Sequence, residues 1–103
     1  MKLTWIMGTG PATAGELADE IEQVGVLGAG YLYNPETERR CLWGHIRDVY
    51  LDGENVCIAR RDLQPENIEL LFQAGLTQHA NDTFQGTDEA RCTEMVRRLR
   101  AIP

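Results

Sequence analysis

The sequence predicts an α+β fold, a mostly helical single domain over residues 1–103 with three to four helices and a few short strands. Two observations lead to this prediction. Apolar residues recur every three or four positions in several segments, as expected for helices with one buried face. Short β-prone segments lie between them, and glycine or turn signals mark where each piece ends. A chain of this length forms one domain around one core.

The composition is that of an ordinary globular protein, with 43% hydrophobic and 25% charged residues. The net charge of −6 argues against nucleic acid as a partner, because the phosphate backbone is itself negative. No apolar run approaches the roughly 18 residues that a membrane span needs. The N-terminal apolar run ends at Gly8 and is too short for a secretory signal. We therefore expect a soluble cytoplasmic protein with no membrane and no nucleic-acid partner.

Three cysteines occur in the chain, at Cys41, Cys57 and Cys92. Their number is odd, they lie far apart, and they form no Cys-x-x-Cys motif. This pattern predicts buried, reduced thiols in a reducing compartment and not a disulfide framework.

The first part of the chain predicts a strand, a loop and a helix. Leu3–Met7 has the character of a short strand. The glycines of the following loop lack the Gly-Lys-Ser/Thr sequence of a phosphate-binding loop, and we expect no cofactor. A helix is predicted over about 14–24, because Thr13 and Glu16 have capping-box spacing and Gly25 follows as a stop. Residues 26–33 predict an extended segment.

The segment Arg39–Tyr50 predicts a central helix that is buried on most sides. Wound as a helix, it gathers its apolar residues on one wide face, namely Cys41, Leu42, His45, Ile46 and Val49. Wound as a strand, it mixes apolar and charged residues on both faces, so the helical period is favoured. Gly44 indicates close approach by another element. Two alternatives stay open for Val49–Leu51, which either ends this helix or pairs with Val56–Ala59 as a hairpin.

The last third predicts two further helices joined by a loop. Pro65 suits the first turn of a helix that ends at Gly75. Residues 76–82, with the Asn81-Asp82 pair, predict an irregular loop. Thr87 is placed to cap a closing helix. Its apolar stripe consists of Cys92, Met95, Val96, Leu99 and Ile102. We expect this stripe to pack on the central helix.

Charge is distributed unevenly along the chain. The first helix carries an acidic patch, formed by Glu16, Asp19, Glu20 and Glu22. The closing helix carries a basic patch, formed by Arg91, Arg97, Arg98 and Arg100. The two patches are either solvated helix faces or meet, within one chain or between two copies. Because several apolar stripes and a strand at a sheet edge need covering, we also predict a homodimer.

Several short motifs resemble an uncharacterised family of small bacterial domains. They are Gly30-Tyr31, the Cys-x-x-Gly segment at Cys41–Ile46, and Asn81-Asp82 before the helix from Thr87. The match spans about residues 17–101, and Trp43 and His45 depart from the small residues usual in the family. The resemblance implies a helix at 39–49 and no particular activity. In style, the chain also resembles orphan proteins of mobile gene cassettes and phages.

Cys41 and His45 lie four residues apart on one face of the predicted helix. Together they could form a nucleophile with its base or, with Cys57 and His79, a set of four zinc ligands. The spacing matches no zinc finger or ribbon. We prefer a buried thiol and a core histidine, and we expect no metal and no catalytic residue.

A second constellation comprises His79, Asn81 and Asp82, which could bind a polar ligand or form an Asx turn. Trp43 is an amphipathic aromatic that can contribute to a binding surface. The favoured hypothesis is a non-enzymatic binding or adaptor module of a bacterium or mobile element. Its candidates for contact with a protein or small-molecule partner are Trp43, His45, His79, Asn81 and Asp82. The alternative is a small enzyme that uses Cys41, His45 and His79.

Overall fold

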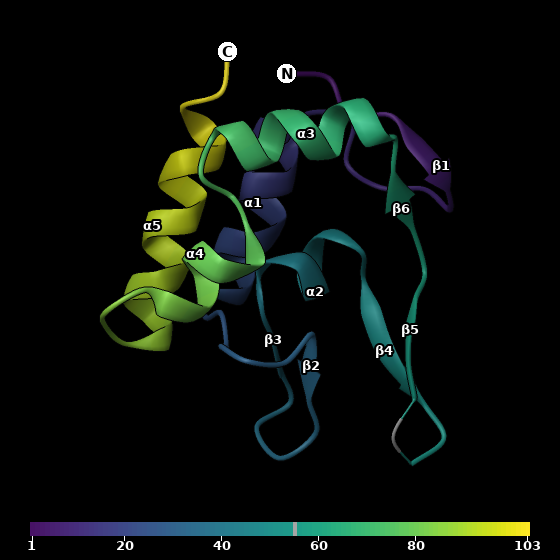
Figure 1. The fold of residues 1–103 in the computed structure, drawn as a ribbon, viewed down its shortest axis with the longest axis vertical. Coiled ribbons are helices and arrows are strands. Elements are labelled where there is room, and N and C mark those ends of the chain that lie inside the picture. Colours follow the sequence, from purple (N-terminus) through teal and green to yellow (C-terminus); the bar gives the residue numbers. More distant parts are fainter. Residues whose placement is uncertain (55) are drawn as a thin grey trace.

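A computed structural model describes residues 1–54 and 56–103 and confirms the α+β class. Within these residues the helices are α1 (Ala14–Val24), α2 (Leu42–Ile46), α3 (Pro65–Gln73), α4 (Gln78–Thr83) and α5 (Asp88–Arg100). The strands are β1 (Trp5–Met7), β2 (Tyr33–Asn34), β3 (Arg39–Arg40), β4 (Val49–Asp52), β5 (Val56–Ala59) and β6 (Asp62–Leu63). Helices α1, α3 and α5 form the upper part of Figure 1, and the β2–β3 and β4–β5 hairpins project below them.

The strands pair antiparallel in three separate two-stranded ladders, β1 with β6, β2 with β3 and β4 with β5. In the longest ladder, Val49 lies opposite Ala59 and Leu51 lies opposite Cys57. The alternative left open for Val49–Leu51 is thereby decided, because this segment is a hairpin strand and not the end of a helix.

Helix α1 has the bounds that its local sequence predicts. The Thr13 Oγ1 accepts a hydrogen bond from the Glu16 amide at 3.1 Å, which satisfies one of the free N–H groups of the first turn. At the other end, Gly25 adopts a left-handed backbone with φ of 82° and donates to the Ile21 carbonyl. The prediction of a helix over 14–24 is confirmed.

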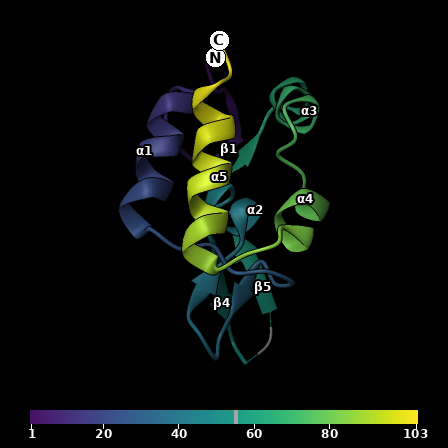
Figure 2. The same ribbon diagram turned by 90° about the vertical axis from the view of Figure 1, so that its left-hand side faces the viewer.

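Helix α5 begins as predicted, with the Thr87 Oγ1 accepting from the Ala90 amide at 3.1 Å. The stripe residues Cys92, Met95, Val96 and Leu99 are buried. Their main partner is α1, which lies beside α5 in Figures 1 and 2. We expected the stripe to pack on the central helix, and its main partner is instead α1. No helix in the described ranges is both long and apolar enough to cross a membrane.

The acidic and basic patches meet within one chain through Arg100, whereas Arg91, Arg97 and Arg98 pair with carboxylates of α5 itself. The Arg100 guanidinium lies 2.8 Å from the Asp19 carboxylate and 3.3 Å from that of Glu22. These contacts add to the packing of α5 on α1, although exposed ion pairs contribute little stability. Arg100 is therefore paired within the chain, and the homodimer stays a prediction.

The predicted central helix is wrong in its extent, because the segment Arg39–Tyr50 divides into β3, α2 and the start of β4. Helix α2 begins after Cys41, whose Sγ accepts from the Gly44 amide at 3.4 Å. It ends before Asp48, whose backbone is left-handed with φ of 49°. Pairing of the flanking residues with β2 and β5 therefore overrides the helical period at both ends.

The predicted burial of the segment is confirmed, because every residue of α2 is buried. Arg61 donates to the Ile46 carbonyl at 2.7 Å and to the His45 carbonyl at 2.8 Å, which satisfies acceptors at the helix end. Close approach at Gly44 is also confirmed, since a Cβ atom there would overlap the carbonyl oxygen of Leu32.

The irregular loop predicted over residues 76–82 is wrong, because most of it forms α4. The Thr77 Oγ1 accepts from the Ala80 amide at 3.0 Å and caps the helix. The Asn81-Asp82 pair that suggested a turn lies inside this helix. One turn of α4 consequently presents Gln78 and Asp82, four residues apart, on the same side.

Candidate functional site

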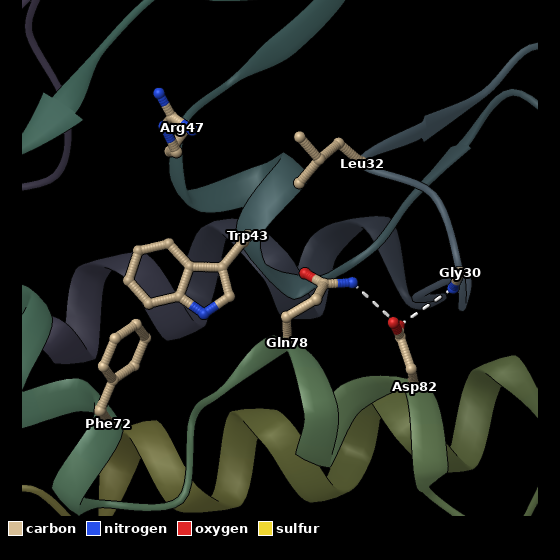
Figure 3. Close-up of a pocket in the computed structure, with 7 residues that line it drawn as sticks. All are labelled: Gly30, Leu32, Trp43, Arg47, Phe72, Gln78 and Asp82. Atoms are coloured by element: carbon tan, nitrogen blue, oxygen red, sulfur yellow. Dashed lines mark hydrogen bonds between the residues drawn. The ribbon is translucent and has the colours of Figure 1, made fainter.

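A pocket of about 440 Å³ opens between α2, α3 and α4. Its lining residues are Gly30, Leu32, Trp43, Arg47, Phe72, Gln78 and Asp82. Figure 3 shows that Trp43 and Phe72 form one side of it, while Gln78 and Asp82 reach in from α4. This volume lies within the ~300–1,000 Å³ typical of small-molecule sites.

The apolar side of the pocket is an aromatic pair. The ring centroids of Trp43 and Phe72 lie 5.5 Å apart, and the rings are inclined at 67° in an edge-to-face arrangement. Trp43 is buried, and its indole N–H donates to the Leu76 carbonyl at 2.9 Å, which orients the ring. Phe72 is 48% exposed. An exposed aromatic ring beside a pocket offers apolar contact to a ligand.

The polar side is a carboxylate held in place by three donors. The Asp82 Oδ1 accepts from the Gly30 amide at 3.0 Å, the Gln78 Nε2 at 2.9 Å and the Asn81 Nδ2 at 3.0 Å. Desolvation alone would raise the pKa of Asp82, but the hydrogen bonds from Gly30, Asn81 and Gln78 outweigh it and lower that pKa. Asp82 is therefore ionised at neutral pH, and its position is determined by the fold.

Asn81 donates a hydrogen bond to this carboxylate and is itself held by the surrounding backbone. It is fully buried. Its Oδ1 accepts from the Leu42 amide at 3.1 Å, and its Nδ2 donates to the Gly28 carbonyl at 3.0 Å. A single side chain thus joins α4 to the start of α2 and to the segment before β2. Asn81 positions the pocket residues and does not line the pocket.

Arg47 is the cationic member of the lining. Its Nε is buried and has no hydrogen-bond partner among the described residues. The Asp62 Oδ1 lies 3.6 Å away, within ion-pair distance but beyond a good hydrogen bond. The charge of Arg47 is therefore partly balanced by the carboxylate of Asp62 on β6.

The thiol of Cys41 lies under α4. It donates to the Gln78 Oε1 at 3.3 Å and accepts from the Gly44 amide. Desolvation by burial raises the pKa of this thiol, so it is protonated at neutral pH and is a poor nucleophile. Cys57, by contrast, is exposed on β5. The prediction that all three cysteines are buried is wrong for Cys57 and correct for Cys41 and Cys92.

His45 is buried, as predicted, and is 7% exposed. Its Nε2 has no partner among the described residues. The pKa of His45 is lowered to about 4, mainly by desolvation and also by the charges of Arg40 and Arg61, which outweigh the opposing charges of Glu20 and Asp48. The imidazole is therefore neutral at physiological pH.

The structure separates the five candidate residues into three groups. Trp43 and Asp82 line the pocket, and Asn81 fixes Asp82. His45 is buried and outside the lining, and His79 is exposed on α4, also outside it. The proposed trio of Cys41, His45 and His79 shares no side-chain hydrogen bond among the described residues. No group of three or more potential ligand side chains in residues 1–54 and 56–103 could hold a metal ion.

Sequence reasoning missed Phe72 and Gln78 as pocket residues. Nothing in the local sequence distinguishes Phe72 from the other apolar residues of its helix, yet it is half exposed at the pocket edge. Gln78 could have been found through Thr77, a capping residue that signals a helix and places Gln78 four residues before Asp82. Leu32 and Arg47 had no local signal, since tertiary contacts alone bring them to the pocket.

Comparison with known protein families, curated proteins and solved structures found no match to this chain. The resemblance to a family of small bacterial domains therefore stays an expectation from short motifs.

Proposed function

We propose that this chain is a non-enzymatic binding module and that the pocket between α2, α3 and α4 is its binding site. The observation that carries the proposal is the combination of an oriented aromatic pair with a carboxylate fixed by three hydrogen bonds. A mainly apolar lining with a few fixed polar groups is typical of ligand sites.

Two of the groups suggested for catalysis, Cys41 and His45, do not have the required properties. A nucleophilic thiol needs to be ionised, whereas burial raises the pKa of Cys41. A general base works best with a pKa near the operating pH, whereas the pKa of His45 is about 4. A binding role requires neither group to react, so it accounts for both environments.

The test uses NMR of the native protein with a set of small fragments, both charged and neutral. The chain contains two tryptophans, and their indole N–H signals report on different places. Trp43 lines the pocket, whereas the Trp5 indole donates to the Pro11 carbonyl at 3.0 Å, outside the pocket lining. Fragments that bind should shift the Trp43 indole and the Gly30 amide and leave the Trp5 indole unchanged.

Phe72→Ala provides the matched test of the site. It should weaken fragment binding by about tenfold, because it removes half of the aromatic pair. Leu70→Ala is the control, since Leu70 lies on the same helix with a similar exposure of 47%, against 48% for Phe72, but does not line the pocket. Equal losses for the two variants, or fragments that bind elsewhere, would contradict the proposal.

A further inference from the structure

We infer that the ligand of this pocket is an organic cation, an ammonium or guanidinium group carried on a short apolar body. The inference rests on the proposed binding function of the same pocket and names the chemical class of its ligand. Three features carry it: the unshared oxygen of Asp82, the arrangement of the aromatic pair, and the distribution of charge around the pocket.

The Asp82 carboxylate is a preformed anionic anchor. All three of its hydrogen bonds are accepted by Oδ1, and Oδ2 has no partner among the described residues. One oxygen is therefore held by the fold while the other stays available to a donor from outside. Because the carboxylate is already oriented, a cationic ligand need not pay for ordering a mobile side chain.

No protein cation neutralises this anchor directly. Asp82 forms no ion pair within the part of the chain that the structure describes. Arg91, which adds a favourable charge at longer range, is engaged by Asp88 at 2.6 Å. An incoming ammonium or guanidinium can therefore form the missing pair.

The aromatic pair suits the body of such a ligand. In Figure 3 the rings of Trp43 and Phe72 lie on one side of Gln78 and the Asp82 carboxylate on the other, so an elongated molecule can span Gln78. Alkyl groups next to a cation pack on aromatic rings, and the negative face of the ring attracts the cation itself. The Gln78 Nε2 amide donates to the Asp82 Oδ1, so Gln78 leaves the Asp82 Oδ2 to the cation.

The surrounding charge agrees with a cation. The chain has a net charge of −6, which attracts cations at long range. Glu69 lies one turn before Phe72 on α3, outside the pocket lining, and forms no ion pair in the described ranges. Arg47, the cation of the lining, lies above Trp43 in Figure 3, apart from Asp82 at the lower right, and its Nε is 3.6 Å from the Asp62 Oδ1. An anionic ligand would instead meet the ionised Asp82.

The test compares probes of equal size and different charge on the wild-type protein. Benzylammonium, benzyl alcohol and benzoate are titrated while the Gly30 amide and the Trp43 indole are followed by NMR. Benzylammonium should bind about tenfold or more tightly than benzyl alcohol, and benzoate more weakly still. Increasing salt should weaken the binding of benzylammonium and leave that of benzyl alcohol nearly unchanged.

Asp82→Asn tests the anchor, because it removes the charge and keeps an oxygen that can accept from Gly30. It should abolish most of the preference for benzylammonium. Glu66→Gln, on the first turn of α3 and outside the pocket, removes the same charge and should retain the preference. If Asp82→Asn does not fold, the salt dependence in the wild type decides the same question.

The source of the cation is distinguished by a second pair of probes. A capped Ala-Arg-Ala peptide is compared with its citrulline counterpart, which has the same shape without the charge. Preference for the arginine peptide over benzylammonium indicates a basic side chain of a partner protein, and the reverse indicates a free amine. In both cases the cation inference stands.

Two outcomes overturn the inference, and they differ in what they say of the proposed function. If benzyl alcohol or benzoate binds the pocket as tightly as benzylammonium, the pocket is a binding site but not one for cations. If no probe shifts the Gly30 amide or the Trp43 indole, the cation inference and the proposed function both fail.

Discussion

Acidification from pH 7 to pH 5 should destabilise this protein mainly through His45. The pKa of His45 is about 4 in the folded protein, against an ordinary value of 6.5. Below pH 6.5 the unfolded chain therefore takes up a proton that the folded chain does not. Stability is fully present above about pH 6.5, is lost as the pH falls towards 4, and loses nothing further from this group below about 4.

The magnitude follows from the same two values. At pH 5 a histidine with a pKa of 6.5 is almost fully protonated, whereas one with a pKa of about 4 is mostly neutral. Proton linkage then gives a loss of about 2 kcal/mol between pH 7 and pH 5, and about 3 kcal/mol when complete. The pKa values of Asp82, Asp88 and Glu94 are lowered, so these carboxylates contribute below this range.

Urea unfolding at a series of pH values measures this effect. The His45→Gln variant, which cannot titrate, should lose about 2 kcal/mol less than the wild type between pH 7 and pH 5. His79→Gln controls for the loss of a histidine as such, and it should keep the pH dependence of the wild type because His45 is still present. The comparison uses only the change of the unfolding free energy with pH. A destabilisation by the substitution that is the same at every pH therefore does not affect it.

Parallel pH profiles for the wild type and His45→Gln would refute this reasoning. They would mean that His45 takes up its proton as readily in the folded protein as in the unfolded chain. The imidazole would then be available as a base near neutral pH, which is the property that the enzyme hypothesis needs.

Three further predictions concern packing and the thiols. Gly44→Ala should destabilise by about 2–4 kcal/mol in urea unfolding, since the new Cβ meets the Leu32 carbonyl; Gly15→Ala, whose Cβ meets only the Thr13 hydroxyl at 3.9 Å, should be neutral or slightly stabilising. Leu99→Ala should cost about 2–4 kcal/mol, because Leu99 is fully buried on α5, and a loss no larger than that of an exposed position would show that α5 is peripheral. In native protein at neutral pH, an alkylating reagent should label Cys57 quickly and Cys41 only on unfolding, as followed by mass spectrometry; rapid labelling of Cys41 would revive the enzyme hypothesis.

The sequence predicted some kinds of side chain in the candidate site but not the full set of residues that form it. The sequence singled out Trp43 and Asp82, because an amphipathic aromatic and a carboxylate beside polar neighbours are typical of binding sites. It also suggested His45 and His79, and the structure places both outside the pocket lining. A histidine at helical spacing has the same pattern whether its helix turns it into the core or towards a ligand.

The sequence by itself determined the elements whose signals are local. Helices α1 and α5 begin directly after Thr13 and Thr87, because each threonine hydroxyl accepts a hydrogen bond from the amide three residues later. The left-handed backbone at Gly25 ends α1 for an equally local reason. These interactions depend on neighbours in the chain, and a pattern of neighbours can be recognised without a fold.

Only the tertiary structure decided the path from Arg39 to Tyr50 and the existence of the pocket. That segment does have a helical period of apolar residues. Its two ends are nevertheless stabilised more by pairing with β2 and β5 than by continuing a helix. The pocket joins residues as distant as Gly30 and Asp82, through contacts that no local pattern encodes. The folded state minimises the free energy of the whole chain, including its long-range hydrogen bonds and packing. Which of these contacts form therefore depends on the three-dimensional arrangement and not on any one stretch.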